Sequence, residues 1–195
     1  MRSLIVVDAQ NEFSARGQRP VPNHDTALTA IIHWVSHARA EGWPIAWVQH
    51  HNKPHESPAF VPGTWGAELS PGLDPCLDAP DERLFQKDVF GAFTTTDLDA
   101  WLRERRVTDL VIVGFYAHMC LSNSVREALV RGYEVAVDPD ATGARALEHE
   151  RLGPQTADEV RRSALLQLTN MGATVAATPF SASYSPALTS VDSSA

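Results

Sequence analysis

Three side chains of complementary chemistry each follow a short apolar run of the kind that forms buried β-strands. Asp8 closes the run LIVV, Lys87 closes LFQ, and Cys120 comes soon after LVIVG. A thiol is a weak nucleophile until it is deprotonated; a carboxylate can accept its proton, and an ammonium group can stabilise the thiolate. These three groups together would suit attack on an amide or a related acyl carbon.

Cys120 lies where the predicted strand turns into a helix, because apolar residues recur at helical spacing after it. The positive end of a helix lowers the pKa of a thiol, and its unpaired N–H groups point to where an oxyanion would form. A lone buried cysteine, however, is more often a small apolar core residue, and a lone lysine is usually on the surface. Spacing alone leaves both interpretations open.

Alternating strands and helices must position these side chains. Strands are predicted at residues 4–7, 44–48, 84–86, 109–113, 133–137 and 173–177, and helices at about 24–40, 97–105, 120–131 and 156–168. Continuous apolar strands between helices indicate an α/β fold, a three-layer α/β/α sandwich around a mostly parallel sheet. Ligands bind such sheets at the carboxyl ends of the strands, where the three reactive side chains fall.

The chain is predicted to form one domain, residues 1–180, followed by a small, polar and flexible tail at 181–195. Residues 50–81 read as a long loop rich in proline, histidine and glycine. Loops of that length in a globular domain are usually functional or locally folded. We therefore expect this loop to shape the binding site.

The composition narrows the class of protein. The chain has 195 residues, 44% of them hydrophobic, and a formal net charge of -8, which argues against a nucleic-acid or anionic-membrane partner. No apolar stretch approaches the roughly 18 residues of a membrane span, and the first residues lack the apolar region of a signal peptide. We expect a cytoplasmic protein in which Cys120 is free, although a single bridge to Cys76 stays open.

Three blocks in order, VVDAQNEF, FQKDVFGAF and VGFYAHMC, resemble the isochorismatase-like cysteine hydrolases. This superfamily includes nicotinamidases and N-carbamoylsarcosine amidohydrolases. The similarity runs from residue 4 to about residue 178. Each block alone is a weak signal, but all three at predicted strand ends are a strong one. The resemblance implies the isochorismatase-like fold, with its Rossmann-like topology.

The resemblance also implies roles for individual residues. Cys120 would be the nucleophile, Asp8 the general base and Lys87 the third member of a catalytic triad. Attack on the substrate would give a tetrahedral intermediate and then a thioester, which water hydrolyses. A cis peptide bond is expected between Phe115 and Tyr116, with an oxyanion hole formed by the N–H groups of Tyr116 and Cys120.

Four residues are expected near the substrate through the same resemblance: Gln10, Phe13, Trp65 and Phe115. Ordinary core packing is the alternative for Phe13. A loop tryptophan such as Trp65 can also serve as a lid or an interface anchor.

The block around the cysteine departs from the family in one respect. Relatives often have threonine and aspartate three and two residues before the cysteine, whereas this chain has Ala117 and His118. We expect His118 at the rim of the pocket or at a subunit contact. Relatives commonly assemble, so a homodimer or homotetramer is expected.

Three histidines within six residues, His50, His51 and His55, raise the possibility of a metal site. Nicotinamidases bind a divalent metal through an aspartate, a histidine two residues later and further histidines. In this register His51 and His55 match two ligand positions, but Gln49 and Ala59 stand where the aspartate and a third histidine belong. We therefore predict no catalytic metal and no cofactor.

The function predicted from the sequence is hydrolysis of a C–N bond in a small amide, carbamoyl, ureido or lactam substrate through a thioester. One alternative is vinyl-ether hydrolysis of the isochorismatase type, which would rely on Asp8 and would not need Cys120. Another is a non-catalytic binding protein that has kept the fold. Cys120 favours amide chemistry over the first alternative.

Overall fold

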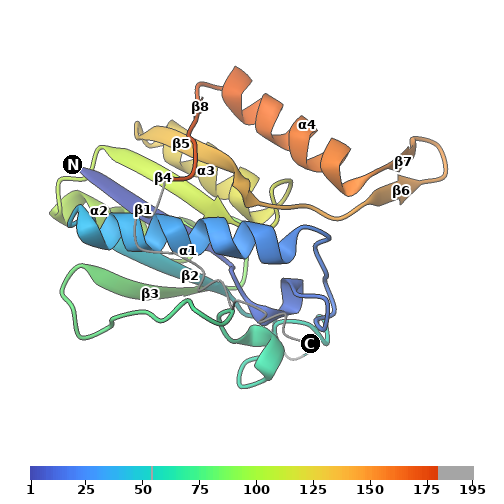
Figure 1. Cartoon of the computed structure of the whole chain (residues 1–195), viewed down its shortest axis with the longest axis horizontal. Coiled ribbons are helices and arrows are strands. Elements are labelled where there is room, and N and C mark those ends of the chain that lie inside the picture. Colours follow the sequence, from blue (N-terminus) through green and yellow to red (C-terminus); the bar gives the residue numbers. More distant parts are fainter. Residues whose placement is uncertain (54, 180–195) are drawn as a thin grey trace, which may run out of the picture.

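Six parallel strands form the central sheet in a computed structural model that describes residues 1–53 and 55–179 (Figure 1). They are β1 (Arg2–Val7), β2 (Ile45–His50), β3 (Glu82–Lys87), β4 (Asp109–Gly114), β5 (Glu134–Thr142) and β8 (Thr174–Val175). Their order across the sheet is β3-β2-β1-β4-β5-β8. The predicted tail at residues 181–195 lies outside the described residues.

Helices cover both faces of this sheet. They are α1 (His24–Ala40), α2 (Leu98–Glu104), α3 (Cys120–Val130) and α4 (Ala157–Asn170). Because side chains alternate along a strand, Leu4 and Val6 of β1 pack with α1, whereas Ile5 and Val7 pack with α2, α3 and α4. Figure 1 shows α1 lying across one face of the sheet. The predicted three-layer α/β/α fold is confirmed.

Two features of the chain differ from the sequence prediction. The exposed hairpin of β6 (Leu147–His149) and β7 (Gly153–Gln155) was not predicted, because its strands lack an apolar face. The expected strand at 173–177 is only two residues long, as β8 lies at the edge of the sheet and pairs with β5 alone. None of the helices in the described residues is long and apolar enough to span a membrane.

The strand order reverses between β1 and β4, which creates a crevice at their carboxyl ends. The chain moves outward from β1 to β2 and β3, and then returns to pair β4 with the other edge of β1. Loops that leave neighbouring strands in opposite directions open a ligand site at this point of an α/β sheet. Asp8 directly follows β1, and Cys120 begins the helix after β4.

Gly114 lets β4 end in close contact with β1. It has a φ of +116°, and a Cβ atom there would lie 1.9 Å from the carbonyl oxygen of Val7. A side chain is therefore excluded both by the backbone conformation and by the space available. Asp8, which follows Val7 at the end of β1, has a φ of +50°. This left-handed conformation is uncommon for a residue other than glycine. The two strand ends that flank the crevice thus share an unusual local geometry.

Candidate active site

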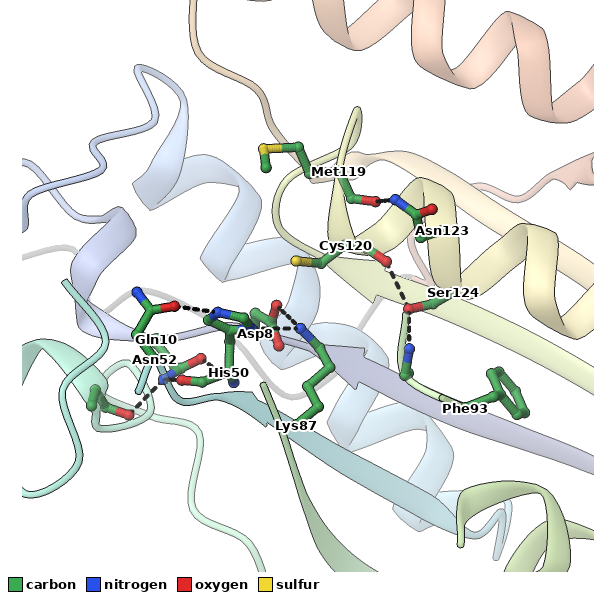
Figure 2. A network of polar contacts seen from close by, with 12 residues as sticks. Asp8, Gln10, His50, Asn52, Lys87, Phe93, Met119, Cys120, Asn123 and Ser124 are labelled. Atoms are coloured by element: carbon green, nitrogen blue, oxygen red, sulfur yellow. Dashed lines mark hydrogen bonds and ion pairs between the residues drawn. The ribbon is translucent and has the colours of Figure 1, made fainter. Parts of the chain in front are cut away.

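Asp8, Lys87 and Cys120 meet at the carboxyl edge of the sheet (Figure 2). The ammonium of Lys87 donates to Oδ2 of Asp8 at 2.7 Å, and the two side chains are 0% and 1% exposed. The Cys120 sulfur lies within 4.8 Å of a carboxylate oxygen of Asp8 and of a ring nitrogen of His50. Three residues far apart in the sequence therefore form one buried polar cluster.

Lys87 reaches Asp8 across an intervening strand. It ends β3, which is separated from β1 by β2, and in the register of β2 with β3 it is paired with His50. Its ammonium nitrogen consequently also lies 3.2 Å from Nδ1 of His50. His50 is thus a member of the cluster that the sequence analysis did not single out.

The hydrogen bonds around His50 determine its protonation pattern. An ammonium group can only donate, so Nδ1 must accept from Lys87. The Asn52 amide nitrogen donates to the carbonyl of Ala59 at 2.8 Å, which leaves Asn52 Oδ1 to accept from Nε2 of His50, also at 2.8 Å. The ring is therefore neutral and carries its proton on Nε2.

The charges in the cluster are those of a resting carboxylate–ammonium pair beside a neutral thiol. Burial is the largest single influence and opposes the charge on Lys87, but Asp8 and Cys120 together outweigh it and raise the pKa of the ammonium. Burial raises the pKa of the Cys120 thiol as well, and the negative charge of Asp8 adds to the rise, while Lys87 opposes it. The expectation that the helix start lowers this pKa is wrong, because desolvation at this buried position is the larger effect.

The loop that leads into α3 presents backbone N–H groups near the thiol. The peptide bond between Phe115 and Tyr116 is cis. The N–H groups of Met119 and Leu121 both donate to the carbonyl of Tyr116, at 3.0 and 3.2 Å. Within residues 1–53 and 55–179, by contrast, no acceptor is found for the N–H groups of Tyr116 and Cys120. Those two donors are free to bind a ligand oxygen.

A cavity of about 300 Å³ opens above the cluster. Asp8, His50 and Cys120 of the cluster are among its lining residues. Its apolar lining consists of Phe13, Phe60, Phe90, Tyr116 and Met119, and its remaining polar lining of Arg19, Asn52, Ser57 and Arg145. A small molecule with an apolar body and a few polar groups would fit such a site.

Of the four residues expected near the substrate, Phe13 alone lines this cavity. Gln10 is fully buried and holds β2 in place: its amide donates to the carbonyl of His50 at 3.0 Å and accepts from the N–H of His50 at 2.8 Å. Phe115 is buried beneath Phe13, with ring centroids 5.2 Å apart. Trp65 is 42% exposed and lies under the guanidinium of Arg16.

His118 lies away from this cavity. It lines a second hollow between α3, α4 and the β6–β7 hairpin, together with Ser122 and Gln155. Both of its ring nitrogens are buried without a hydrogen-bond partner among the described residues. Burial lowers the pKa of His118 to about 4, and the positive charge of Arg145 adds to this effect.

Of the three histidines considered as metal ligands, His50 lines the cavity, whereas His51 and His55 are not among its lining residues. Asp8, His50 and Cys120 do offer three potential ligand atoms within 4.8 Å of one another. The Lys87 ammonium, however, bonds to Asp8 and to Nδ1 of His50, so a cation there would meet a positive charge and an occupied ring nitrogen. This donor set does not suit a metal while Lys87 is charged.

Neither cysteine forms a disulfide: Cys120 is buried and Cys76 exposed, and both are free. The bridge that the sequence left open is therefore not made. The single buried thiol stays available for chemistry.

Comparison with known proteins places the chain in one family. A family model of the isochorismatase domain matches residues 2–178. The isochorismatase family protein YddQ of Bacillus subtilis (strain 168) is 31% identical over 177 residues, which is 90% of this chain and 96% of YddQ. Streptothricin hydrolase of Streptomyces noursei is 34% identical over 141 residues, covering 72% of this chain and 54% of that enzyme.

A solved structure shows the same relationship. The crystal structure of a candidate isochorismatase from Burkholderia xenovorans LB400 superposes with a TM-score of 0.82 at 34% identity, covering 91% of this chain and 83% of that one. The family-model match spans every element that positions Asp8, Lys87 and Cys120. The chain therefore belongs to the isochorismatase family of hydrolases.

Proposed function

We propose that this protein is a cysteine hydrolase that cleaves a C–N bond of a small amide, carbamoyl, ureido or lactam substrate through a thioester. The observation that supports this most directly is that the buried Cys120 sulfur lies within 4.8 Å of a carboxylate oxygen of Asp8, whose side chain has one free oxygen. Oδ2 of Asp8 is bound by Lys87, whereas Oδ1 has no hydrogen-bond partner among the residues described. A thiol beside an unoccupied carboxylate oxygen is a nucleophile beside its base.

Acylation begins with attack of Cys120 Sγ on the carbonyl carbon, as the thiol proton passes to Oδ1 of Asp8. Because the raised pKa keeps the resting sulfur protonated, proton transfer accompanies C–S bond formation rather than preceding it. The carbonyl π electrons move to oxygen, where the N–H groups of Tyr116 and Cys120 donate to the oxyanion. Each donor of this kind typically contributes about 3–4 kcal/mol in the transition state.

The tetrahedral intermediate collapses when protonated Asp8 returns its proton to the substrate nitrogen. The C–N bond breaks, ammonia or an amine leaves, and a thioester to Cys120 remains. Asp8 then takes a proton from water, whose oxygen attacks the thioester carbon. The C–S bond breaks, the sulfur regains its proton and the acid is released. Lys87 stays protonated throughout and balances the charge on Asp8.

The predicted substrate-binding residues take different parts in this proposal. Phe13, on the cavity wall, contacts the substrate directly. Gln10 and Phe115 do not contact the substrate. Gln10 holds the end of β2 that carries His50, and Phe115 packs against Phe13 and supports it. A contact from Trp65 remains a prediction.

The test is hydrolysis of a panel of small amides, ureas and lactams, with release of ammonia or amine as the readout. Cys120→Ser should abolish turnover and Asp8→Asn should lower it by at least about a hundredfold, because general-base catalysis commonly contributes that much. Cys76→Ser is the matched control and should leave the rate unchanged, since Cys76 is exposed and lies outside the cavity. Full activity of Cys120→Ser would exclude thioester chemistry.

Vinyl-ether hydrolysis is the second candidate, and the Asp8 carboxylate beside the cavity is what favours it. Such a reaction needs a proton donor or base and no nucleophile. Cys120→Ala therefore separates the two: an amide hydrolase becomes inactive, whereas a vinyl-ether hydrolase keeps its rate. Inactivity of the unmodified protein on both substrate classes would favour a binding protein that has kept the fold.

Three further expectations are part of the proposal. Hydrolysis should need no metal, so treatment with a chelator should leave the rate unchanged, and loss of activity that zinc or iron restores would contradict this.

Light scattering after gel filtration should give the mass of a homodimer or homotetramer. Fractionation of the native host should find the protein in the cytoplasm.

A further inference from the structure

Two arginines line the cavity, and the hydrolytic steps proposed above use neither of them. Arg19 and Arg145 are both exposed and share the cavity with Cys120. Among the described residues, neither guanidinium pairs with a carboxylate. Arg19 makes one side-chain contact, a 3.4 Å hydrogen bond to the hydroxyl of Ser57. Two unpaired guanidinium groups in one cavity are available to bind an anion.

The backbone on which each arginine stands is tied to the loop that leads to the thiol. The carbonyl of Arg19 accepts a hydrogen bond from the Tyr116 hydroxyl at 2.7 Å. Two residues before Arg145, the carbonyl of Gly143 accepts from the N–H of Ala117 at 2.8 Å. Both side chains therefore project from segments whose position relative to Cys120 is set by hydrogen bonds, which lowers the entropic cost of binding.

The charge balance of the cavity is positive although the protein as a whole is acidic. The net charge of the chain is -8. Among the residues that line the cavity the single carboxylate, Asp8, is already paired with Lys87, so neither arginine has a carboxylate partner there. Burial raises the pKa of the Tyr116 hydroxyl to about 12, and the positive charges of Arg145 and Arg19 act against this rise. The positive charges of both arginines thus act on the same residue of the cavity lining, Tyr116.

We propose that the substrate is an anion: a small amide or ureido compound with a carboxylate, which Arg19 and Arg145 bind while its C–N bond lies at Cys120. This inference rests on the proposed function and narrows the substrate class. A guanidinium matches a carboxylate in shape and can donate two parallel hydrogen bonds to it. The aromatic lining of the cavity, including Phe13 and Phe60, suits a short hydrocarbon body.

The kinetic test compares matched substrates. The half-amides of malonic, succinic and glutaric acids are assayed beside neutral amides in which a methyl group replaces the carboxylate. The acids should have the higher kcat/KM, by about a hundredfold if each arginine contributes about tenfold, as charge-assisted hydrogen bonds typically do. Arg19→Gln and Arg145→Gln should each raise KM for the acids by about tenfold and leave the neutral amides within about twofold.

Arg16→Gln is the matched control for these variants. It removes the same charge from the same loop as Arg19, but its guanidinium stacks on Trp65 and does not line the cavity. It should change neither substrate series. Equal losses in all three variants would show a general field effect and contradict a binding site formed by Arg19 and Arg145.

A second measurement does not depend on turnover. Alkylation of Cys120 by iodoacetate and by iodoacetamide is followed by peptide mass spectrometry, with exposed Cys76 as the internal reference. Iodoacetate should be favoured at Cys120 relative to Cys76 by about tenfold, and the preference should disappear in the Arg19→Gln/Arg145→Gln double variant. An equal reagent ratio at both cysteines would overturn the inference.

The two tests also separate this inference from the proposed function. Cys120-dependent hydrolysis of neutral and acidic amides at the same rate would keep the hydrolase and remove the anion site. Arginine-dependent preference for iodoacetate, without hydrolysis of any amide, would keep the anion site and remove the hydrolase.

Discussion

Lys87 donates to one carboxylate oxygen of Asp8 at 2.7 Å, while the other oxygen, Oδ1, has no hydrogen-bond partner in the part of the chain described. The pair is almost inaccessible to water, with side chains 0% and 1% exposed. A carboxylate bound on one side by an ammonium group can take up a proton only on the other. If Asp8 is the base of the proposed reaction, the pairing therefore leaves one atom, Oδ1, to take up the proton.

The same pairing predicts strong coupling between the two residues in stability. Asp8→Asn and Lys87→Met should each lower the free energy of unfolding by about 3–5 kcal/mol, because either change leaves a buried charge without its partner. The double variant should lose less than the sum of the two. Urea denaturation of all four proteins measures the coupling, and additive losses would show that the ions are not paired in solution.

The Cys120 thiol should stay protonated at neutral pH. Burial raises its pKa, so the unfolded chain loses the thiol proton first as the pH rises above about 8.5. Its contribution to stability is thus complete below that pH and is lost as the pH rises toward the folded pKa. In a Cys76→Ser background, absorbance at about 240 nm should show no thiolate below about pH 9. Thiolate at pH 7 would contradict the raised pKa.

Much of the fold was predictable from the sequence because its strands are buried on both faces. Such strands read as continuous apolar runs, as LIVV in β1 and LVIV in β4 do. Asp8 and Lys87 close such runs at the carboxyl edge of a parallel sheet, and Cys120 begins the helix that follows another, so the three could be placed near one another without coordinates.

The place of His50 beside Lys87 was not predicted, because two other histidines, His51 and His55, lie close to it in the sequence. In the sequence, His50, His51 and His55 are equivalent candidates, and only the pairing of β2 with β3 brings His50 opposite Lys87. The alternation of side chains along β2 was a usable signal, since Val48 and His50 lie on the same face. The thiol pKa could not be predicted, because sequence shows a helix start but not how much water the packed residues exclude.

The hydrogen bond from Nε2 of His50 to Asn52 should fix the tautomer in which Nδ1 accepts from Lys87. Asn52→Asp would place a carboxylate at Nε2 and stabilise the imidazolium, whose second N–H would then face the Lys87 ammonium. We expect turnover to fall by about 10–100-fold, with a smaller loss in Asn52→Ala, which adds no charge. Nitrogen-15 NMR of labelled histidine should show the His50 ring charged at neutral pH in Asn52→Asp alone. A neutral ring there would contradict this account.

Gly114→Ala should damage the protein far more than a comparable change elsewhere. The new methyl group would lie 1.9 Å from the Val7 carbonyl oxygen, and the φ of +116° disfavours any side chain. Gly132→Ala is the control, because its φ is also positive at +86° but nothing lies within 4 Å of the added Cβ. The control should lose about 1 kcal/mol of unfolding free energy and keep its activity. Equal losses of unfolding free energy in both variants would mean that β1 and β4 can move apart enough to accommodate the methyl group.

His118 should make the protein sensitive to mild acid. Because burial lowers its pKa to about 4, the unfolded chain binds the proton first as the pH falls below about 6.5. The neutral ring therefore favours folding above about pH 6.5, and that contribution is lost as the pH falls toward 4. His118→Leu should flatten the fall of Tm over this range, whereas His55→Leu, a change at an exposed loop position, should keep the wild-type slope. Circular dichroism melts at a series of pH values measure both slopes, and identical slopes for the two variants would rule out titration of His118 as the cause.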